Sequence, residues 1–175
     1  SVRLANFLSE LDSTKVRTVA YVPEQALADA SIIAMACDQL VMHEEAILGG
    51  SGARELDRDD VELAVVAIRE IMFGKSRPWS LPTAMIDSEL EVHRYQLVET
   101  TVTVFLSNEE LLAQQDSERW KQQEQITTLG ETLQVSGPEA VNLRLARYVV
   151  KDFDEFRQHY QLEESPELLK PNWAH

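Results

Sequence analysis

Cysteine is almost absent from this sequence, and that scarcity limits the chemistry available to it. The single cysteine, Cys37, excludes an internal disulfide and any metal site built from several cysteines. Cys37 lies in the apolar run SIIAMACD, which favours a small buried side chain over a reactive thiol. Glycine and proline are also scarce, with six of each in 175 residues, which excludes a loop-dominated chain. No stretch approaches the roughly 20 apolar residues of a membrane span, and no signal peptide is recognisable.

Positive charge is the second shortage. The chain has 16 lysine and arginine residues against 30 acidic ones, a formal net charge of −14 at pH 7. Binding to nucleic acid or to an anionic membrane surface depends on clustered basic side chains, so we expect neither partner for this chain itself. What the sequence does have is a 44% share of hydrophobic residues, enough for the core of one domain of ordinary size.

Motifs for metal or nucleotide cofactors are missing as well. The four histidines share no i, i+3 or i+4 spacing, and there is no Cys/His cluster and no calcium-binding loop. The stretch GGSGA at 49–53 lacks the lysine of a phosphate-binding loop, which favours a structural turn. The acidic pairs at 44–45, 59–60 and 109–110 lie in turns or at expected helix N-termini, where carboxylates need no catalytic role. We therefore expect no cofactor and no metal.

Hydrophobic periodicity predicts an α/β fold. The first half of the chain alternates between types of element: a helix at 3–12, a strand at 15–23, a buried helix at 29–39, and short strands at 40–43 and 46–50. This order is typical of a parallel sheet covered by helices.

The clearest helix is expected at 56–74. Asp57 is a natural N-cap, acids follow in the first turn, and Gly74 ends the pattern. Its expected buried stripe is Val61, Val65, Ile68 and Met72.

The second half of the chain is richer in strand signals. The expected elements are one short helical turn within 75–87, two strands within 90–106, a helix at 107–115, a strand, turn, helix and strand within 130–150, and a last helix at 152–160. Ser107 and Glu110 have the spacing of a capping box at the start of the helix at 107–115.

Residues 16–53, VRTVAYVPEQALADASIIAMACDQLVMHEEAILGGSGA, resemble the core of the ClpP-class membrane serine proteases, the NfeD-like and SppA-like group of the ClpP/crotonase superfamily. The resemblance continues through IREIMFGKSRPWSLPTAMID at 68–87 and GETLQVSGPEAVNLRLARYVV at 130–150. It implies a layered α/β fold of the ClpP/crotonase type over 1–162, with a β-rich insertion at about 90–130. In the family, further strands precede the first helix, so either they have been removed here or a partner supplies them. The polar tail, 163–175, is expected to lead toward a membrane segment absent from this chain.

The resemblance also implies a Ser–Lys dyad, or Ser–His–Asp in ClpP itself. The serine falls on Asp29 and the following glycine on Ser31, while the lysine falls on or beside Asp59. The sequence departs from both catalytic positions, because it contains no lysine from Val16 to Gly74. The histidine of ClpP would fall near residues 53–54, which are alanine and arginine.

The physical chemistry of acyl transfer favours a loss of catalysis. A serine hydroxyl needs an adjacent base, and a carboxylate at Asp29 would repel the oxyanion that develops. Two substitute nucleophiles are weak: Ser31 is turned about 200° away round the helix, and Ser51 has an arginine nearby but no base. An Asp29 nucleophile lacks a well-placed histidine.

The leading hypothesis is a catalytically degenerate ClpP-class domain of an NfeD-like membrane protein, which acts in membrane-protein assembly or partner binding on the extracytoplasmic (periplasmic) side. Its expected partners are a membrane protein or peptide and further copies of the chain. An active ClpP-class serine endopeptidase, with an unorthodox site or one completed by residues outside this chain, stays open as the alternative. A crotonase-like acyl-CoA enzyme is the second alternative.

Overall fold

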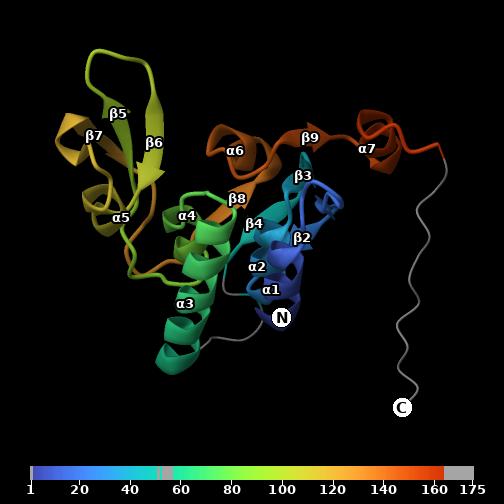
Figure 1. The fold of residues 1–175 in the computed structure, drawn as a ribbon, viewed down its shortest axis with the longest axis horizontal. Coiled ribbons are helices and arrows are strands. Elements are labelled where there is room, and N and C mark those ends of the chain that lie inside the picture. Colours follow the sequence, from blue (N-terminus) through green and yellow to red (C-terminus); the bar gives the residue numbers. More distant parts are fainter. Residues whose placement is uncertain (1, 51, 53–56, 164–175) are drawn as a thin grey trace.

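Two small sheets form the centre of the fold (Figure 1). The computed structural model describes residues 2–50, 52 and 57–163. The first sheet is parallel and consists, in spatial order, of β1 (Val19–Val22), β3 (Gln39–His43) and β9 (Tyr148–Val150). The second consists of β2 (Gln25–Ala26), β4 (Ile47–Gly49) and β8 (Gln134–Ser136), with β2 and β4 parallel and β8 antiparallel to β4. The parallel pairing expected from the element order is confirmed.

Two strands of the first sheet, β1 and β3, each lead after a short turn into a strand of the second. β1 ends at Val22, directly before Pro23, because proline has no backbone N–H for the ladder. The chain resumes as β2, and β3 passes into β4 in the same way. The second sheet therefore continues from the carboxyl ends of the first sheet's strands, where parallel folds place their sites.

Helix α2 (Asp29–Ala36) lies in the middle of the core. Ser31, Ile32, Ala34, Met35 and Ala36 are buried, as the apolar sequence on nearly every face of the helix predicts. Helix α1 (Val2–Glu10) packs against both α2 and α3 (Arg58–Gly74).

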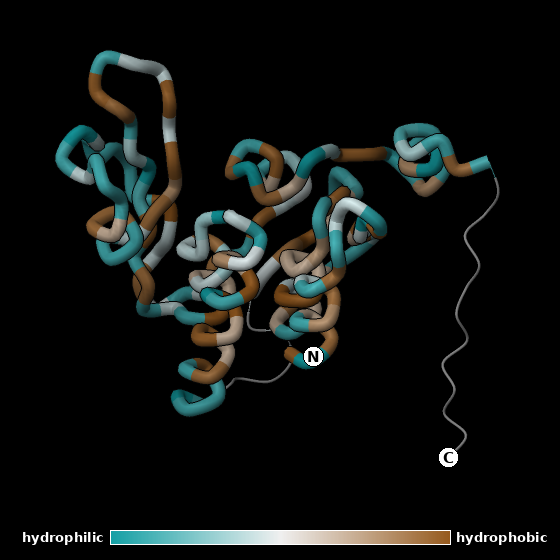
Figure 2. Tube along the Cα trace, in the orientation of Figure 1, coloured by the Kyte–Doolittle hydropathy of each residue, from teal (hydrophilic) through white to brown (hydrophobic). Residues whose placement is uncertain are grey.

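Helix α3 begins as the sequence predicts, but its buried face is rotated from the expected one. The Asp57 carboxylate caps the helix by accepting the N–H of Asp60 at 2.9 Å. Val61 and Val65 are only partly buried, and the buried residues are Ala64, Ala67, Ile68, Ile71 and Met72. The small alanines lie inside because α1, α2 and α4 approach this helix closely. Figure 2 shows the mixed hydropathy along α3 that a surface helix requires.

A buried ion pair holds the chain at the carboxyl end of α2. Asp38 bonds Lys75 at 2.6 Å and accepts the N–H of Thr18 at 2.8 Å, with the Lys75 side chain only 8% exposed. Arg77 donates to the carbonyls of Cys37, at 3.0 Å, and Asp38. Burial opposes ionisation of Asp38, yet the hydrogen bonds from Lys75 and Thr18 outweigh it and lower its pKa. These contacts join the last turn of α2 to the segment that follows α3.

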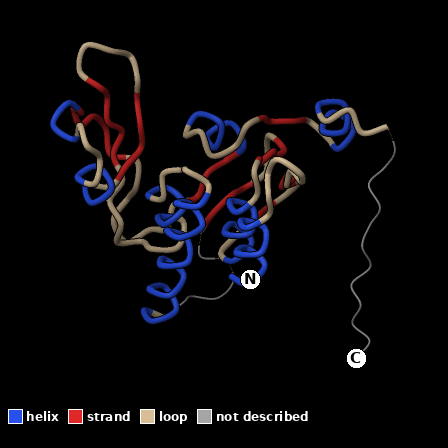
Figure 3. The backbone as a smooth tube through the Cα atoms, in the orientation of Figure 1, coloured by secondary structure: helices blue, strands red, loops and turns tan. Residues whose placement is uncertain are grey.

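The β-rich segment expected at about 90–130 forms a separate antiparallel sheet, visible apart from the core strands in Figure 3. Its order is β6 (Thr103–Leu106), β5 (His93–Leu97) and β7 (Trp120–Gln125), with α5 (Asn108–Leu112) and the 3₁₀ turn Ser117–Arg119 between β6 and β7. The two strands expected within 90–106 are confirmed, and they pair antiparallel as β5 and β6. The sequence did not predict β7, because WKQQEQ is nearly all polar and only half of a two-sided pattern.

Of the two hydrogen bonds in the capping box expected at α5, the structure has only the one accepted by Ser107. Ser107 does accept the N–H of Glu110, at 3.2 Å. The Glu110 carboxylate, however, is buried and turns to α4 (Ser80–Ala84), where it accepts the N–H groups of Trp79 and Ser80 at 2.9 Å each. It also accepts the Ser80 hydroxyl at 2.5 Å. The Glu110 carboxylate therefore bonds the N-terminus of α4 instead of its own helix. These bonds connect the insertion to the core.

The C-terminal elements complete the fold. Helix α6 (Gly137–Asn142) begins with a complete capping box, made by Ser136 and Glu139. In helix α7 (Phe153–His159), the Phe156 ring stacks on the Tyr21 ring of β1, with 4.9 Å between the two ring centroids. The expected polar tail lies outside the described residues from 164 onward. Within the part of the chain that is described, no helix is both long enough and apolar enough to cross a membrane.

Candidate functional site

The N-terminus of α2 begins in a strained turn. Ala28, its N-cap, has φ 45° and ψ −120°, and no side chain caps the helix there. A non-glycine residue in this region costs of order 1–3 kcal/mol, and such strain is concentrated at functional sites. A strand that leads through a sharp, strained turn into a helix is also the backbone arrangement that holds the nucleophile in α/β-hydrolases.

The strained turn is fixed by backbone bonds on both sides. The N–H of Ala28 donates to the carbonyl of Gly50 at 3.0 Å, and the Ala28 carbonyl accepts the N–H of Ser31 at 3.0 Å. The carbonyl also accepts the Ser31 hydroxyl at 2.6 Å. Gly49 and Gly50 both have positive φ, and a Cβ on Gly49 would collide with the Leu133 carbonyl. The glycine-rich turn is thus structural: it brings the end of β4 against the start of α2.

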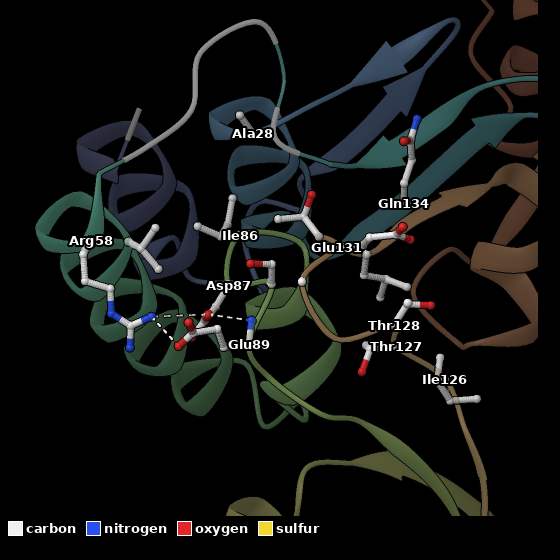
Figure 4. A pocket seen from close by; sticks show the side chains of 15 residues that line it. Ala28, Arg58, Ile86, Asp87, Glu89, Ile126, Thr127, Thr128, Glu131 and Gln134 are labelled. Carbon is white, nitrogen blue, oxygen red and sulfur yellow. Dashed lines mark hydrogen bonds and ion pairs between the residues drawn. The ribbon is translucent and has the colours of Figure 1, made fainter.

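A cavity of about 730 Å³ opens beside this turn (Figure 4). Its described walls are the starts of α2 and α3, the loop after α4, and the segment that leads back from the insertion to β8. The lining residues are Ala28, Arg58, Val61, Ile86, Asp87, Ser88, Glu89, Ile126, Thr127, Thr128, Gly130, Glu131, Thr132, Leu133 and Gln134. This volume lies in the range of ligand-binding clefts.

Charged groups gather on one side of the cavity. The Arg58 guanidinium points to the loop after α4 (Figure 4) and lies 3.0 Å from Glu89 and 3.8 Å from Asp87. Its Nε is also 3.3 Å from Glu62 of the same helix. The charge of Glu89, the hydrogen bond to Glu62 and the charge of Asp87 together raise the pKa of Arg58. Glu131 comes from the opposite wall.

The structure places the predicted dyad positions next to this cavity rather than in its lining. Asp29 is the first residue of α2 and is exposed, and the lining residue is its neighbour, Ala28. Asp59 is exposed in the first turn of α3, and the lining residue is again its neighbour, Arg58. The starts of α2 and α3 therefore both contribute to the wall of this cavity.

The two substitute serines have different outcomes. Ser31 is 1% exposed, and its hydroxyl donates a hydrogen bond to the Ala28 carbonyl. This buried, bonded hydroxyl has a structural role at the start of α2. Ser51 lies outside the described residues.

Candidate bases are also held elsewhere. Lys75 is committed to Asp38 at the far end of α2. His43, His93 and His159 do not belong to the described lining, whose hydroxyl groups are those of Ser88, Thr127, Thr128 and Thr132. The Thr127 hydroxyl accepts the N–H of Val92 and donates to the Leu90 carbonyl, both at 3.0 Å, which gives it a structural role. No group of three or more His, Cys, Asp or Glu residues in the described ranges is arranged to hold a metal ion.

Sequence reasoning missed Ala28 and the far wall of the cavity. One local signal pointed to Ala28: alanine is a poor N-cap, and aspartate is favoured just after it, so an alanine in that place suggests a backbone kept for another reason. The far wall had no local signal, because residues 126–134 return to the site from the insertion about a hundred residues after α2.

Comparisons with known proteins support the fold. No family model matches the sequence, and no curated protein matches it. The solved structures that resemble this chain include two of the membrane-bound stomatin-specific protease 1510-N: a serine-to-alanine mutant, and a lysine-to-alanine mutant in complex with a substrate peptide. Each is 12% identical over 89% of this chain, with TM-scores of 0.50 and 0.51. This chain spans 59% and 57% of their lengths, less than two thirds. The fold expected from the sequence is confirmed: the chain has the α/β fold of a ClpP-like serine protease.

Proposed function

We propose that this chain is a ClpP-class domain without proteolytic activity, which binds a peptide segment of a membrane-protein partner in the cavity beside α2. The observation that carries the proposal is Ala28, a methyl side chain on the strained turn that lines the cavity. The backbone of a nucleophile turn is kept at an energetic cost, while its side chain has no reactive atom.

The absence of a serine nucleophile at the start of α2 does not depend on how the family motif is aligned. The resemblance puts the serine position on Asp29, and the backbone geometry favours Ala28. Neither residue carries a hydroxyl. The Asp29 carboxylate would in addition place negative charge where acyl transfer requires an oxyanion to be stabilised.

Among the described residues, the start of α3 likewise offers no lysine or histidine base. Serine attack requires a neighbouring group that takes up the hydroxyl proton. At the start of α3 the chain offers Arg58, which forms ion pairs with carboxylates, and Asp59. Val16 to Gly74 contains no lysine, and Lys75 forms the buried pair with Asp38.

A role in peptide binding fits the cavity, which is present although the described starts of α2 and α3 lack the serine and its base. The cavity is large enough for a peptide segment, and one structural neighbour is a substrate-peptide complex of a membrane-bound protease. We extend the proposal to the wider assignment that the sequence suggests: a domain of an NfeD-like membrane protein, on the extracytoplasmic side, which assembles with further copies of itself and takes part in membrane-protein assembly.

The test is a paired measurement of chemistry and binding on the purified chain. We expect no labelling by a fluorophosphonate and no cleavage of a hydrophobic peptide, together with saturable binding of that peptide by fluorescence anisotropy. Labelling or cleavage that disappears in Ser31→Ala, Ser51→Ala or Ser88→Ala would establish an active serine protease and overturn the proposal. Failure to bind any peptide would also overturn it.

A further inference from the structure

We infer that the cavity beside α2 selects a peptide with a lysine or arginine side chain, an inference that rests on the proposed peptide-binding function. Four of the described lining residues are ionisable: Arg58, Asp87, Glu89 and Glu131. One positive and three negative charges leave a formal charge of −2. This local imbalance has the same sign as the net charge of the whole chain, −14, so the surrounding field reinforces it.

The one cation of the described lining is already neutralised by neighbours. Arg58 lies within 4 Å of three carboxylates, those of Glu62, Asp87 and Glu89. An anionic ligand would have to displace them before it could use the guanidinium. Glu131 reaches the cavity from the other wall, separately from this cluster (Figure 4).

Apolar groups complete the match to a basic side chain. Ala28, Val61, Ile86, Ile126 and Leu133 line the cavity together with the carboxylates. Lysine and arginine bury a flexible apolar stem and keep the charged end with polar partners. A cavity with apolar walls and carboxylates therefore suits a basic side chain better than either an aliphatic or an acidic one.

Two other cavity ligands fit less well. Polyphosphate-bearing ligands such as acyl-CoA depend on clustered free cations, which this lining does not offer among its described residues. A divalent metal would need several ligand groups converging on one point, and the described residues show no such group. An organic cation on a peptide satisfies the charge without either requirement.

The experiment compares three labelled peptides that differ only at one central position: lysine, norleucine or glutamate. We expect the lysine peptide to bind about tenfold more tightly than the glutamate peptide at low salt, with the preference shrinking as salt is added. Equal binding of the norleucine and lysine peptides would overturn the inference while leaving the proposed function intact. If none of the three peptides binds, both the inference and the proposed peptide-binding function are wrong.

Two variants change the cavity charge in opposite directions. Glu131→Gln should weaken binding of the lysine peptide about threefold, whereas Glu118→Gln, an exposed acid outside the lining, should not change it. Arg58→Gln frees Asp87 and Glu89, so it should tighten the lysine peptide and weaken the glutamate peptide. The reverse response of Arg58→Gln would show that the site binds anions. Circular dichroism and thermal unfolding of each variant verify that the fold is retained.

Discussion

The N–H of Ala28 donates to the carbonyl of Gly50 at 3.0 Å, and this bond joins the start of α2 to the glycine turn after β4. Ala28 has a strained backbone, and Gly50 has φ 89°. The bond holds the helix N-terminus at the wall of the cavity. The shape of this part of the site is thus set by the backbone and does not require a reactive side chain at either residue.

Relief of this strain should stabilise the chain. We expect Ala28→Gly to raise the free energy of unfolding by about 1 kcal/mol, because glycine adopts φ 45° without a Cβ clash and this gain exceeds its cost in the unfolded state. Urea denaturation measures the change. Ala30→Gly, two residues on in an exposed helical position, is the matched control and should cost about 0.5–1 kcal/mol. Equal destabilisation by both variants would show that Ala28 is not strained.

The elements that the sequence predicted well have short-range causes. Asp57 caps α3, Pro23 limits β1, and the apolar pattern of α2 marks it as buried. The errors have long-range causes. Glu110 looked like part of a local capping box, but its carboxylate bonds a helix start 30 residues away. The rotation of α3 toward Ala64 likewise depends on which helices pack against it, and no periodicity within the helix contains that information.

The candidate site also has a part that the sequence pointed to and a part that depends on long-range contacts. The family resemblance pointed to the starts of α2 and α3, and both border the cavity through Ala28 and Arg58, the neighbours of Asp29 and Asp59. The acidic far wall was not predictable, because Glu131 reaches the cavity only through the path of the insertion.

Glu110 should be the anchor between the insertion and the core. We expect Glu110→Ala to cost about 2–4 kcal/mol, because two backbone N–H groups and the Ser80 hydroxyl lose their acceptor in a buried place. Hydrogen exchange should then show faster opening of β5 to β7. The neighbouring Glu109→Ala removes an exposed ion pair with Arg69 and should have a clearly smaller effect. Similar losses in the two variants would contradict the anchoring role.

The buried pair of Asp38 and Lys75 predicts a specific dependence on pH. The folded chain lowers the pKa of Asp38 below its ordinary value of 3.8, so its contribution to stability is complete above that value and is lost as pH falls through the lower, folded pKa. We expect Asp38→Asn to cost about 3 kcal/mol at neutral pH, since it leaves the Lys75 charge buried without a partner. The difference between wild type and Asp38→Asn should shrink below about pH 4. A constant difference from pH 7 to pH 2 would show that packing, not charge, sets the cost.

Reintroduced chemistry can decide which residue holds the nucleophile position. If Ala28 occupies it, Ala28→Ser combined with Asp59→Lys supplies a hydroxyl on the strained turn and a base at the start of α3, and the double variant should gain labelling by a fluorophosphonate. Ala28→Ser alone lacks the base and should label far more slowly. Asp29→Ser with Asp59→Lys places the hydroxyl one residue further on, at an exposed position outside the described cavity lining, and should stay unlabelled. Mass spectrometry of the modified peptide identifies the reacting serine. Labelling of the Asp29→Ser pair, without labelling of the Ala28→Ser pair, would return the nucleophile position to Asp29 and leave the strain at Ala28 as a feature of the helix start alone.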